Sequence, residues 1–327
     1  MASPDDLVSL TATEAVARLK SGELQPLDLV EAAATRIEAV EPQVNALPHR
    51  FLDQAREAAK AFAARNRDAA GREHPGWLAG LPIAVKDYND VAGHPTTYGS
   101  PLFANAVAAE SDVTVRRLDA RGALPIAKAN VPEFAGANTF NPVYGQTRNP
   151  WDLSRTVGGS SGGSAAALAS GSVWLATGND LGGSLRIPAS YCGIVGLRPG
   201  VGRVPRPAGC LPFDPLWVEG PMGRTVADVA LMLDAEAGST PQDPLALPAP
   251  AVPFQQSVRN PVAPRRVGFT ADLGQGRAVD SEVVTLCRAA TERFAEMGAN
   301  VEAACPDLAD GIDCFQVLRA QMFASLR

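Results

Sequence analysis

Few histidines, no clustered cysteines and no surplus of basic charge mark this 327-residue chain. Its three histidines, His49, His74 and His94, lie in the first third of the sequence, and no two are spaced i, i+4. The five cysteines are scattered without a C-x-x-C pair, which favours reduced thiols over disulfides. Because zinc sites need these residues at close spacing, the sequence predicts no metal site.

Charge and hydropathy exclude further classes of protein. Lysine and arginine number 29 against 35 acidic residues, and no block of like charge occurs, which argues against a nucleic-acid partner. Residues 1–20 carry acidic side chains and no apolar core, unlike a secretory signal. The longest uncharged stretch, 156–179, is too rich in glycine, serine and threonine for membrane insertion. We therefore expect a cytoplasmic protein with no membrane partner.

The arrangement of apolar residues predicts an α/β fold. Apolar residues make up 46% of the chain, enough for a sizeable core. Helical spacing runs through 11–66, where Thr11 and Glu14 match a capping box and Gly22 a helix stop. From Trp77 onward, short apolar runs alternate with helical patterns, which predicts a mixed or parallel sheet. The expected strands are 81–85, 123–127, 173–176, 266–269 and 300–303, and the expected helices in this part are 113–121, 281–297 and 312–326.

A glycine- and serine-rich segment, GGSSGGS at 158–164, is followed by DLGGSLR at 180–186. A phosphate-binding P-loop would need a lysine here, and no lysine follows Lys128. Residues 158–162 match the G-x-S-x-G nucleophile elbow, but that fold needs a histidine after the serine, and none follows His94. The remaining interpretation is a serine nucleophile whose base is not histidine.

Lys86 is the candidate base, because it directly follows the apolar run 81–85 at the end of an expected strand. A lysine must be neutral to accept a proton, which requires a shift of about three pKa units, or about 4 kcal/mol, that burial can supply. Ser184 also follows an expected strand. Gly182 and Gly183 permit a turn whose N–H groups converge on an oxyanion, with Asp180 and Arg186 pairing across it.

These residues stand in motifs through which the chain resembles the amidase signature family. The matching segments are GLPIAVKD at 80–87, KANVPEF at 128–134, GQTRNPWD at 145–152, GGSSGGSA at 158–165, GNDLGGSLRIP at 178–188, GIVGLRP at 193–199 and GRVP at 202–205. The resemblance runs from the N-terminal helices to about residue 235 and is weaker beyond. It implies an amidase signature fold, a mixed β-sheet core covered by helices on both faces.

The resemblance also implies a Ser-cisSer-Lys triad of Lys86, Ser160 and Ser184. Ser184 would attack the amide carbonyl, and Ser160, after a cis peptide bond from Gly159, would relay the proton to Lys86. The oxyanion hole and the supporting residues are also implied by the family. The oxyanion hole would consist of the N–H groups of Leu181, Gly182, Gly183 and Ser184, and the supporting residues would be Ser161, Asp180 and Arg186.

The sequence departs from the family in places. Asn179 and Leu181 replace residues that are more often Ser and Thr, and Arg198 stands where lysine is common. Family members are considerably longer, so we expect a fold that is incomplete at the C-terminus. The expected organisation is one amidase signature domain over 1–327. Its parts are a helical layer 1–70, a signature core 75–235, a Pro-rich crossing segment 241–264 without regular structure, and a partial second α/β part 265–327.

The main functional hypothesis is an amidase that hydrolyses linear amides through an acyl-enzyme, without metal or cofactor, on a small-molecule substrate. One alternative is the glutaminase subunit of a tRNA-dependent amidotransferase, although such subunits usually carry Gln where this chain has Ile187. A second is a non-catalytic truncated remnant. A homodimer is compatible with the sequence, which does not decide the matter.

Overall fold

The computed structural model describes residues 3–65, 69–207 and 211–325, and it divides into two compact units, Met1–Val258 and Arg259–Arg327. Cys210 lies outside the described residues; the other four cysteines are free thiols, as predicted. Among the described residues, no helix is long and apolar enough to cross a membrane.

A six-stranded mixed sheet forms the centre of the first unit, in the order β1-β3-β2-β8-β10-β9. The middle strands β3, β2 and β8 are parallel, and the other pairings are antiparallel. The sheet strands are β1 (His49–Arg50), β2 (Pro82–Lys86), β3 (Leu124–Ala129), β8 (Leu175–Asp180), β9 (Val195–Gly196) and β10 (Val218–Gly223).

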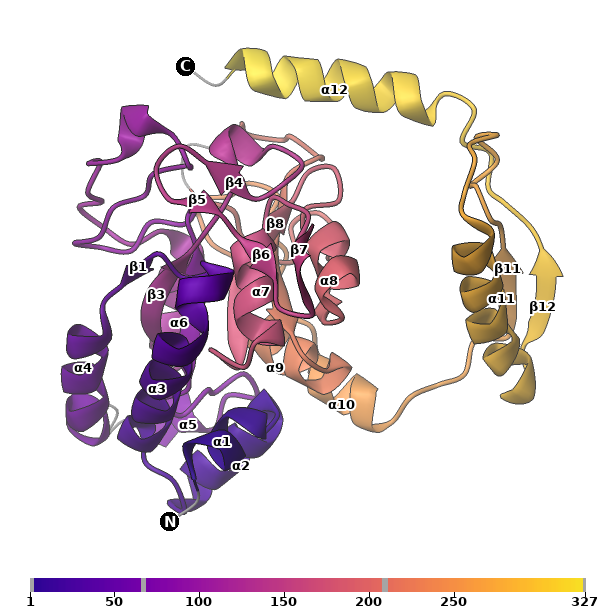
Figure 1. Cartoon of the computed structure of the whole chain (residues 1–327). Coiled ribbons are helices and arrows are strands. Elements are labelled where there is room, and N and C mark those ends of the chain that lie inside the picture. Colours follow the sequence, from indigo (N-terminus) through magenta and orange to yellow (C-terminus); the bar gives the residue numbers. More distant parts are fainter. Residues whose placement is uncertain (1–2, 66–68, 208–210, 326–327) are drawn as a thin grey trace. The chain divides into compact units, whose positions relative to one another are not determined.

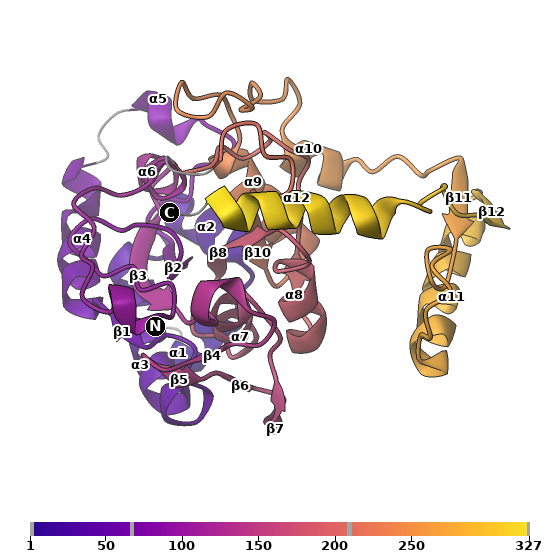
Figure 2. The ribbon, with the colours of Figure 1, turned by 90° about the horizontal axis from the view of Figure 1, so that it is seen from above.

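Helices cover both faces of this sheet, as predicted, with α3 and α7 on one side and α6 and α9 on the other (Figures 1 and 2). The helices of the unit are α1 (Pro4–Ser9), α2 (Ala12–Ser21), α3 (Pro26–Val44), α4 (Leu52–Arg65), α5 (Ala69–Arg72), α6 (Val113–Ala120), α7 (Gly162–Ala169), α8 (Arg186–Cys192), α9 (Val226–Glu236) and α10 (Phe254–Arg259). Shorter elements are the 3₁₀ turns η1 (Pro101–Phe103) and η2 (Glu133–Ala135) and the strands β4 (Phe140–Asn141), β5 (Gly145–Gln146), β6 (Arg148–Asn149) and β7 (Asp152–Thr156).

The local signals at α2 act as predicted. Thr11 and Glu14 form a reciprocal capping box, and Gly22 ends the helix in the left-handed conformation that glycine adopts easily. The predicted helical stretch 11–66 is nevertheless interrupted by β1, because His49 and Arg50 pair with the edge of β3.

Strand β8 begins and ends later than the predicted run 173–176. The polar residues Asn179 and Asp180 continue the strand because β8 is paired with β2 on one side and β10 on the other. Their side chains find buried partners, which removes the cost of placing them inside. Asp180 is therefore the last residue of the strand, while the turn begins at Leu181.

The Pro-rich segment 241–264 was predicted to lack regular structure, and this is wrong for α10. Asp234 of α9 accepts hydrogen bonds from the backbone N–H groups of Phe254 (2.7 Å) and Gln255 (3.1 Å). A carboxylate at a helix N-terminus satisfies donors that the helix itself leaves unpaired. The helix thus depends on a residue 20 positions away, which local composition does not reveal.

The second unit consists of a parallel pair of strands with two helices. Strands β11 (Arg266–Phe269) and β12 (Asn300–Ala303) pair in parallel and are joined by α11 (Ser281–Glu296). A last helix, α12 (Gly311–Ser325), follows. The predicted strand, helix, strand and helix of this part are all confirmed in order.

Candidate active site

Lys86 lies at the carboxyl end of β2 and is completely buried. Its Nζ atom lies 2.7 Å from Ser160 Oγ, 2.9 Å from Ser161 Oγ and 2.6 Å from Asn179 Oδ1. Because β2 and β8 are parallel neighbours, their carboxyl ends bring Lys86 and Asn179 to the same edge of the sheet. The structure therefore brings together the predicted lysine and both predicted serines of the first motif.

Ser160 lies in a loop that closely approaches another backbone segment. The Gly159–Ser160 peptide bond is cis, as the resemblance implies. A Cβ atom on Gly159 would lie 3.0 Å from the carbonyl oxygens of Gly136 and Ala137, so this position suits glycine. Ser161 is the residue that precedes α7, and it is buried with Ser160. The loop thus presents both hydroxyls to Lys86.

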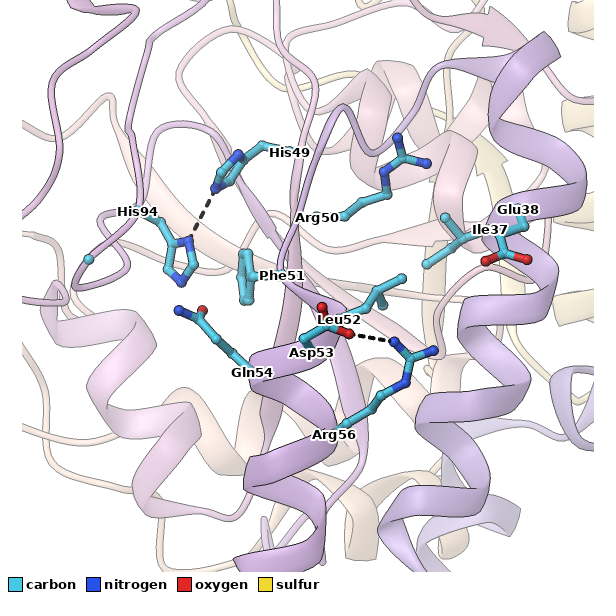
Figure 3. Close-up of a pocket in the computed structure, with 11 residues that line it drawn as sticks. Ile37, Glu38, His49, Arg50, Phe51, Leu52, Asp53, Gln54, Arg56 and His94 are labelled. Atoms are coloured by element: carbon cyan, nitrogen blue, oxygen red, sulfur yellow. Dashed lines mark hydrogen bonds and ion pairs between the residues drawn. The ribbon is translucent and has the colours of Figure 1, made fainter.

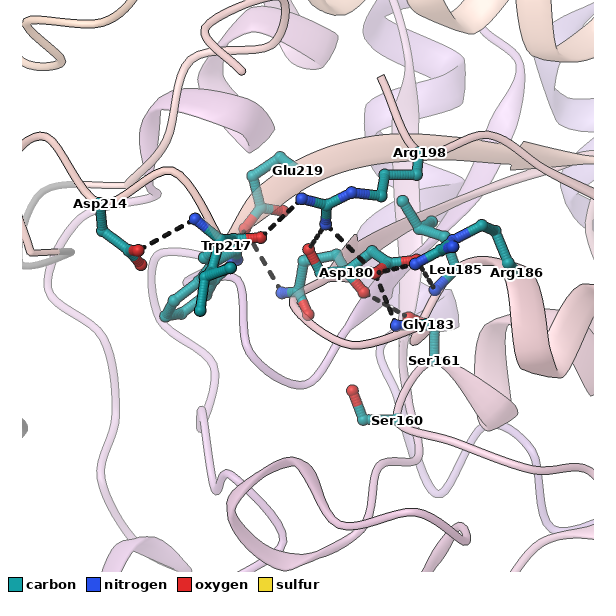
Figure 4. A network of polar contacts seen from close by, with 12 residues as sticks. Ser160, Ser161, Asp180, Gly183, Leu185, Arg186, Arg198, Asp214, Trp217 and Glu219 are labelled. Carbon is teal, nitrogen blue, oxygen red and sulfur yellow. Dashed lines mark hydrogen bonds and ion pairs between the residues drawn. The ribbon is translucent and has the colours of Figure 1, made fainter. Parts of the chain in front are cut away.

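Asp180 fixes the turn that carries Ser184 (Figure 4). Its carboxylate accepts the backbone N–H groups of Gly183 (2.7 Å) and Leu185 (3.2 Å). The predicted ion pair with Arg186 is present at 3.0 Å, and Arg198 makes a second one at 3.2 Å. Burial by itself would raise the pKa of Asp180, but the hydrogen bonds from Arg186 and Gly183 outweigh it and lower the pKa. Asp180 is therefore held as an anion.

Ser184 is half-buried and is linked to the first serine loop through its backbone, since its carbonyl accepts the Ser161 N–H at 3.3 Å. In the part of the chain that the structure describes, its hydroxyl has no hydrogen-bond partner, and neither do the N–H groups of Leu181, Gly182 and Ser184. The Gly183 N–H, by contrast, is engaged by Asp180. Three N–H groups of this turn are thus left to bind an anion beside Ser184.

Asn179 and Glu219 complete the surroundings of Lys86, and sequence reasoning did not single them out as site residues. Asn179 donates from Nδ2 to Glu219 Oε1 at 3.3 Å, and Trp217 Nε1 donates to the same oxygen at 3.0 Å. Glu219 is completely buried on β10. Asn179 stands inside a quoted motif, where its departure from the family was the available signal, whereas burial of Glu219 has no local signature.

The electrostatics favour a neutral lysine near pH 7. Burial lowers the pKa of the Lys86 amine to about 7, and the nearby carboxylates of Glu219 and Asp180 oppose this shift. Burial raises the pKa of Glu219 to about 7, with Asp112 adding to the effect. The neutral amine can accept a proton from a hydroxyl, which an ammonium group cannot do.

Aromatic side chains extend in series from Lys86. The Tyr88 ring centroid lies 5.2 Å from Lys86 Nζ. Edge contacts then join Tyr88 to Tyr98 (5.1 Å), Tyr98 to Phe103 (5.4 Å) and Phe103 to Phe134 (6.2 Å). Phe103 and Phe134 are partly exposed, so the series runs from the buried lysine to the surface.

A separate hollow of about 630 Å³ lies beside β1, and its lining includes none of these residues (Figure 3). His49 and His94 contact each other there at 3.1 Å, and Phe51 stacks on His94. Across the described ranges, no group of three or more histidine, cysteine or acidic side chains is arranged to hold a metal ion.

Comparison with known proteins gives one family. A family model described as Amidase matches residues 28–325. An acylamidase of Rhodococcus erythropolis is 40% identical over 299 residues, covering 91% of this chain and 62% of that protein. The glutamyl-tRNA(Gln) amidotransferase A-type subunit of Prochlorococcus marinus (strain MIT 9303) is 39% identical over 306 residues, covering 92% of this chain and 62% of that protein.

A solved bacterial aryl acylamidase of the amidase signature enzymes is similar in fold, with a TM-score of 0.83 and 34% identity over 90% of this chain and 61% of that one. The expected fold class is thereby confirmed. The chain spans about three fifths of the length of the relatives named here.

Proposed function

The chain belongs to the amidase family, and on that premise we propose that it hydrolyses carboxylic amides through an acyl-enzyme formed on Ser184. The observation that carries the proposal is the buried Lys86 amine, 2.7 Å from the Ser160 hydroxyl. A serine hydroxyl reacts at neutral pH only when a neighbouring group takes its proton, and no other base contacts these serines among the described residues.

The proposed first step forms the acyl-enzyme. Ser184 Oγ attacks the amide carbonyl and passes its proton to Ser160, while Ser160 passes its own proton to neutral Lys86. The carbonyl oxygen becomes an oxyanion, which the N–H groups of Leu181, Gly182 and Ser184 stabilise. Gly183, which the resemblance includes in this oxyanion hole, contributes through the shape of the turn, because its N–H is donated to Asp180.

The second step releases the amine. The Lys86 ammonium returns a proton through Ser160 to the nitrogen of the leaving group, and the C–N bond breaks. Water then attacks the acyl-enzyme ester, its proton following the same route to Lys86, and the carboxylate leaves as Ser184 regains its hydrogen. No metal ion or cofactor takes part in this scheme.

The aromatic series beside Lys86 supports an amide with an apolar substituent as the substrate class. Tyr88, Tyr98 and Phe103 offer edges and faces but no charge, which suits an alkyl or aryl group better than an amino acid head group. Hydrolysis of linear amides of this kind is the reaction that we propose for the chain.

A serine-directed fluorophosphonate tests the proposal, with intact mass and peptide mapping as the readout. A single adduct on Ser184 is expected, and it should be absent from Ser184→Ala. No adduct on a folded chain would contradict the proposal and favour the alternative that the site residues are a non-catalytic remnant.

The second candidate, a glutaminase subunit of a tRNA-dependent amidotransferase, is favoured by the 39% identity to the Prochlorococcus protein. Ile187 stands where such subunits usually carry Gln, which weighs against it. Ammonia release from glutamine that requires added partner subunits would support this candidate. Glutamine turnover that stays absent when partners are added would exclude it.

A further inference from the structure

We propose that Glu219 is a positioning residue for this reaction, which fixes through the Asn179 amide the direction in which the Lys86 amine faces Ser160. The inference rests on the proposed function, because it assigns Lys86 the role of base. It adds a residue outside the triad, the oxyanion turn and their supporting residues.

Glu219 and Asn179 are direct cross-strand partners in the antiparallel pair of β10 and β8. The Glu219 carboxylate accepts hydrogen bonds from three neutral donors, Asn179 Nδ2 (3.3 Å), Asn89 Nδ2 (3.2 Å) and Trp217 Nε1 (3.0 Å). Within the described ranges, no lysine or arginine forms an ion pair with it. The carboxylate is thus buried among groups that orient it rather than neutralise it.

The orientation of the Asn179 amide follows from this contact. A carboxylate only accepts hydrogen bonds, so the NH₂ end of the amide must face Glu219 and the carbonyl end must face Lys86. Asn179 Oδ1 therefore accepts one N–H of Lys86 at 2.6 Å. Without the carboxylate, the amide could turn and present its NH₂ group to the amine.

The second N–H of Lys86 is directed at Ser161. The Ser161 hydroxyl donates to the Asn179 carbonyl at 3.4 Å, which leaves its oxygen to accept from Lys86 at 2.9 Å. A neutral amine has two N–H bonds and one lone pair. With both N–H bonds taken, the lone pair faces Ser160 Oγ at 2.7 Å, the atom whose proton it must accept.

A parallel connection holds the backbone of Lys86. Asn89 donates to Glu219 and accepts from Thr177 Oγ1 at 3.0 Å, and the same hydroxyl oxygen accepts the Lys86 backbone N–H at 2.9 Å. Glu219 thus constrains Lys86 at both its side chain and its main chain.

The charged groups around the pair set the expected pH effect. Lys86 faces Glu219 from β10 and Asp180 from β8, with the Tyr88 ring alongside. Glu219 also faces Asp112 at the start of α6 and, more weakly, Asn179 and Lys86 itself. Glu236 at the end of α9 lies close enough to interact with Glu219. Because the Glu219 anion favours protonated Lys86, its removal favours the neutral base at lower pH.

The test compares Glu219→Gln with Glu236→Gln, using the rate of Ser184 labelling by a fluorophosphonate between pH 5.5 and 9.5. Glu236 is a matched control, a buried carboxyl whose oxygens have no hydrogen-bond partner among the described residues and whose pKa burial raises, so it is neutral. For Glu219→Gln, we expect the plateau rate to fall roughly tenfold. The midpoint should move down by roughly one pH unit. Glu236→Gln should keep the wild-type profile.

Asn179→Ser provides a second variant, in case Glu219→Gln does not fold. It keeps the carboxylate but removes the amide that joins it to Lys86, so both changes should occur in the same direction. A folded variant of either kind with the wild-type plateau and midpoint would overturn the inference. Failure of the wild-type chain to label at Ser184 would instead overturn the proposed function, so the two failures are distinguishable.

Discussion

The Ser160 hydroxyl lies 2.7 Å from the Lys86 amine, and both side chains are almost completely excluded from solvent. At this distance a proton can pass directly between oxygen and nitrogen. Because bulk water does not reach the pair, the amine loses the solvation that would otherwise keep it charged. A histidine-poor chain thereby acquires a base that works near neutral pH.

The first prediction concerns pH. The pKa of Lys86 is lowered to about 7, and only the neutral amine accepts a proton. We expect kcat/KM for an amide substrate to rise about tenfold per unit at low pH and to level off above about pH 7. Initial rates between pH 5.5 and 9 test this, and a flat profile over that range would contradict the lysine base.

The second prediction concerns the nucleophile and the base. Ser184→Ala removes the attacking oxygen and Lys86→Ala removes the proton acceptor, so each should lower kcat/KM by roughly 10³-fold or more. Lys60→Ala is the control, because that lysine is exposed and pairs only with Glu57. Turnover at the wild-type rate in either site variant would refute the assignment.

The third prediction concerns Asp180. Replacement by Asn weakens the ion pairs with Arg186 and Arg198 and presents a donor to backbone N–H groups, which should lower the free energy of unfolding by about 2–4 kcal/mol. Activity should fall with it, since the turn holds Ser184. Asp152→Asn is the matched control, because that carboxylate also accepts a backbone N–H and pairs with an arginine but is half exposed. Equal stability of the two variants, measured by urea unfolding, would be the contrary result.

The fourth prediction concerns the start of α7. A Cβ on Gly163 would lie 2.3 Å from the Asn130 backbone nitrogen and 2.8 Å from the Ala46 carbonyl oxygen. Gly163→Ala should therefore lower stability by about 1–3 kcal/mol, because backbone atoms must move. At Gly200 an added Cβ has open space, so Gly200→Ala should leave the melting temperature nearly unchanged. Melting curves of both variants decide the point.

Several parts of this protein follow from short stretches of sequence. The capping box of Thr11 and Glu14 and the strand bounds of β11 were predicted because neighbouring residues satisfy or align the backbone locally. Lys86 and Ser160 were assigned to one site by motif resemblance and by their positions near strand and helix ends. The Asp180–Arg186 pair spans six residues, so one turn decides it.

Tertiary structure alone decided the rest, because it depends on groups that are distant in the sequence. Nothing local shows that Glu219 is buried against Asn179, 40 residues away, or that Asp234 starts α10. The second guanidinium on Asp180, from Arg198, likewise comes from beyond α8. The sequence by itself determined which reactive groups this chain has, and packing of β2, β8 and β10 decided their burial, their partners and hence the proton affinity of Lys86.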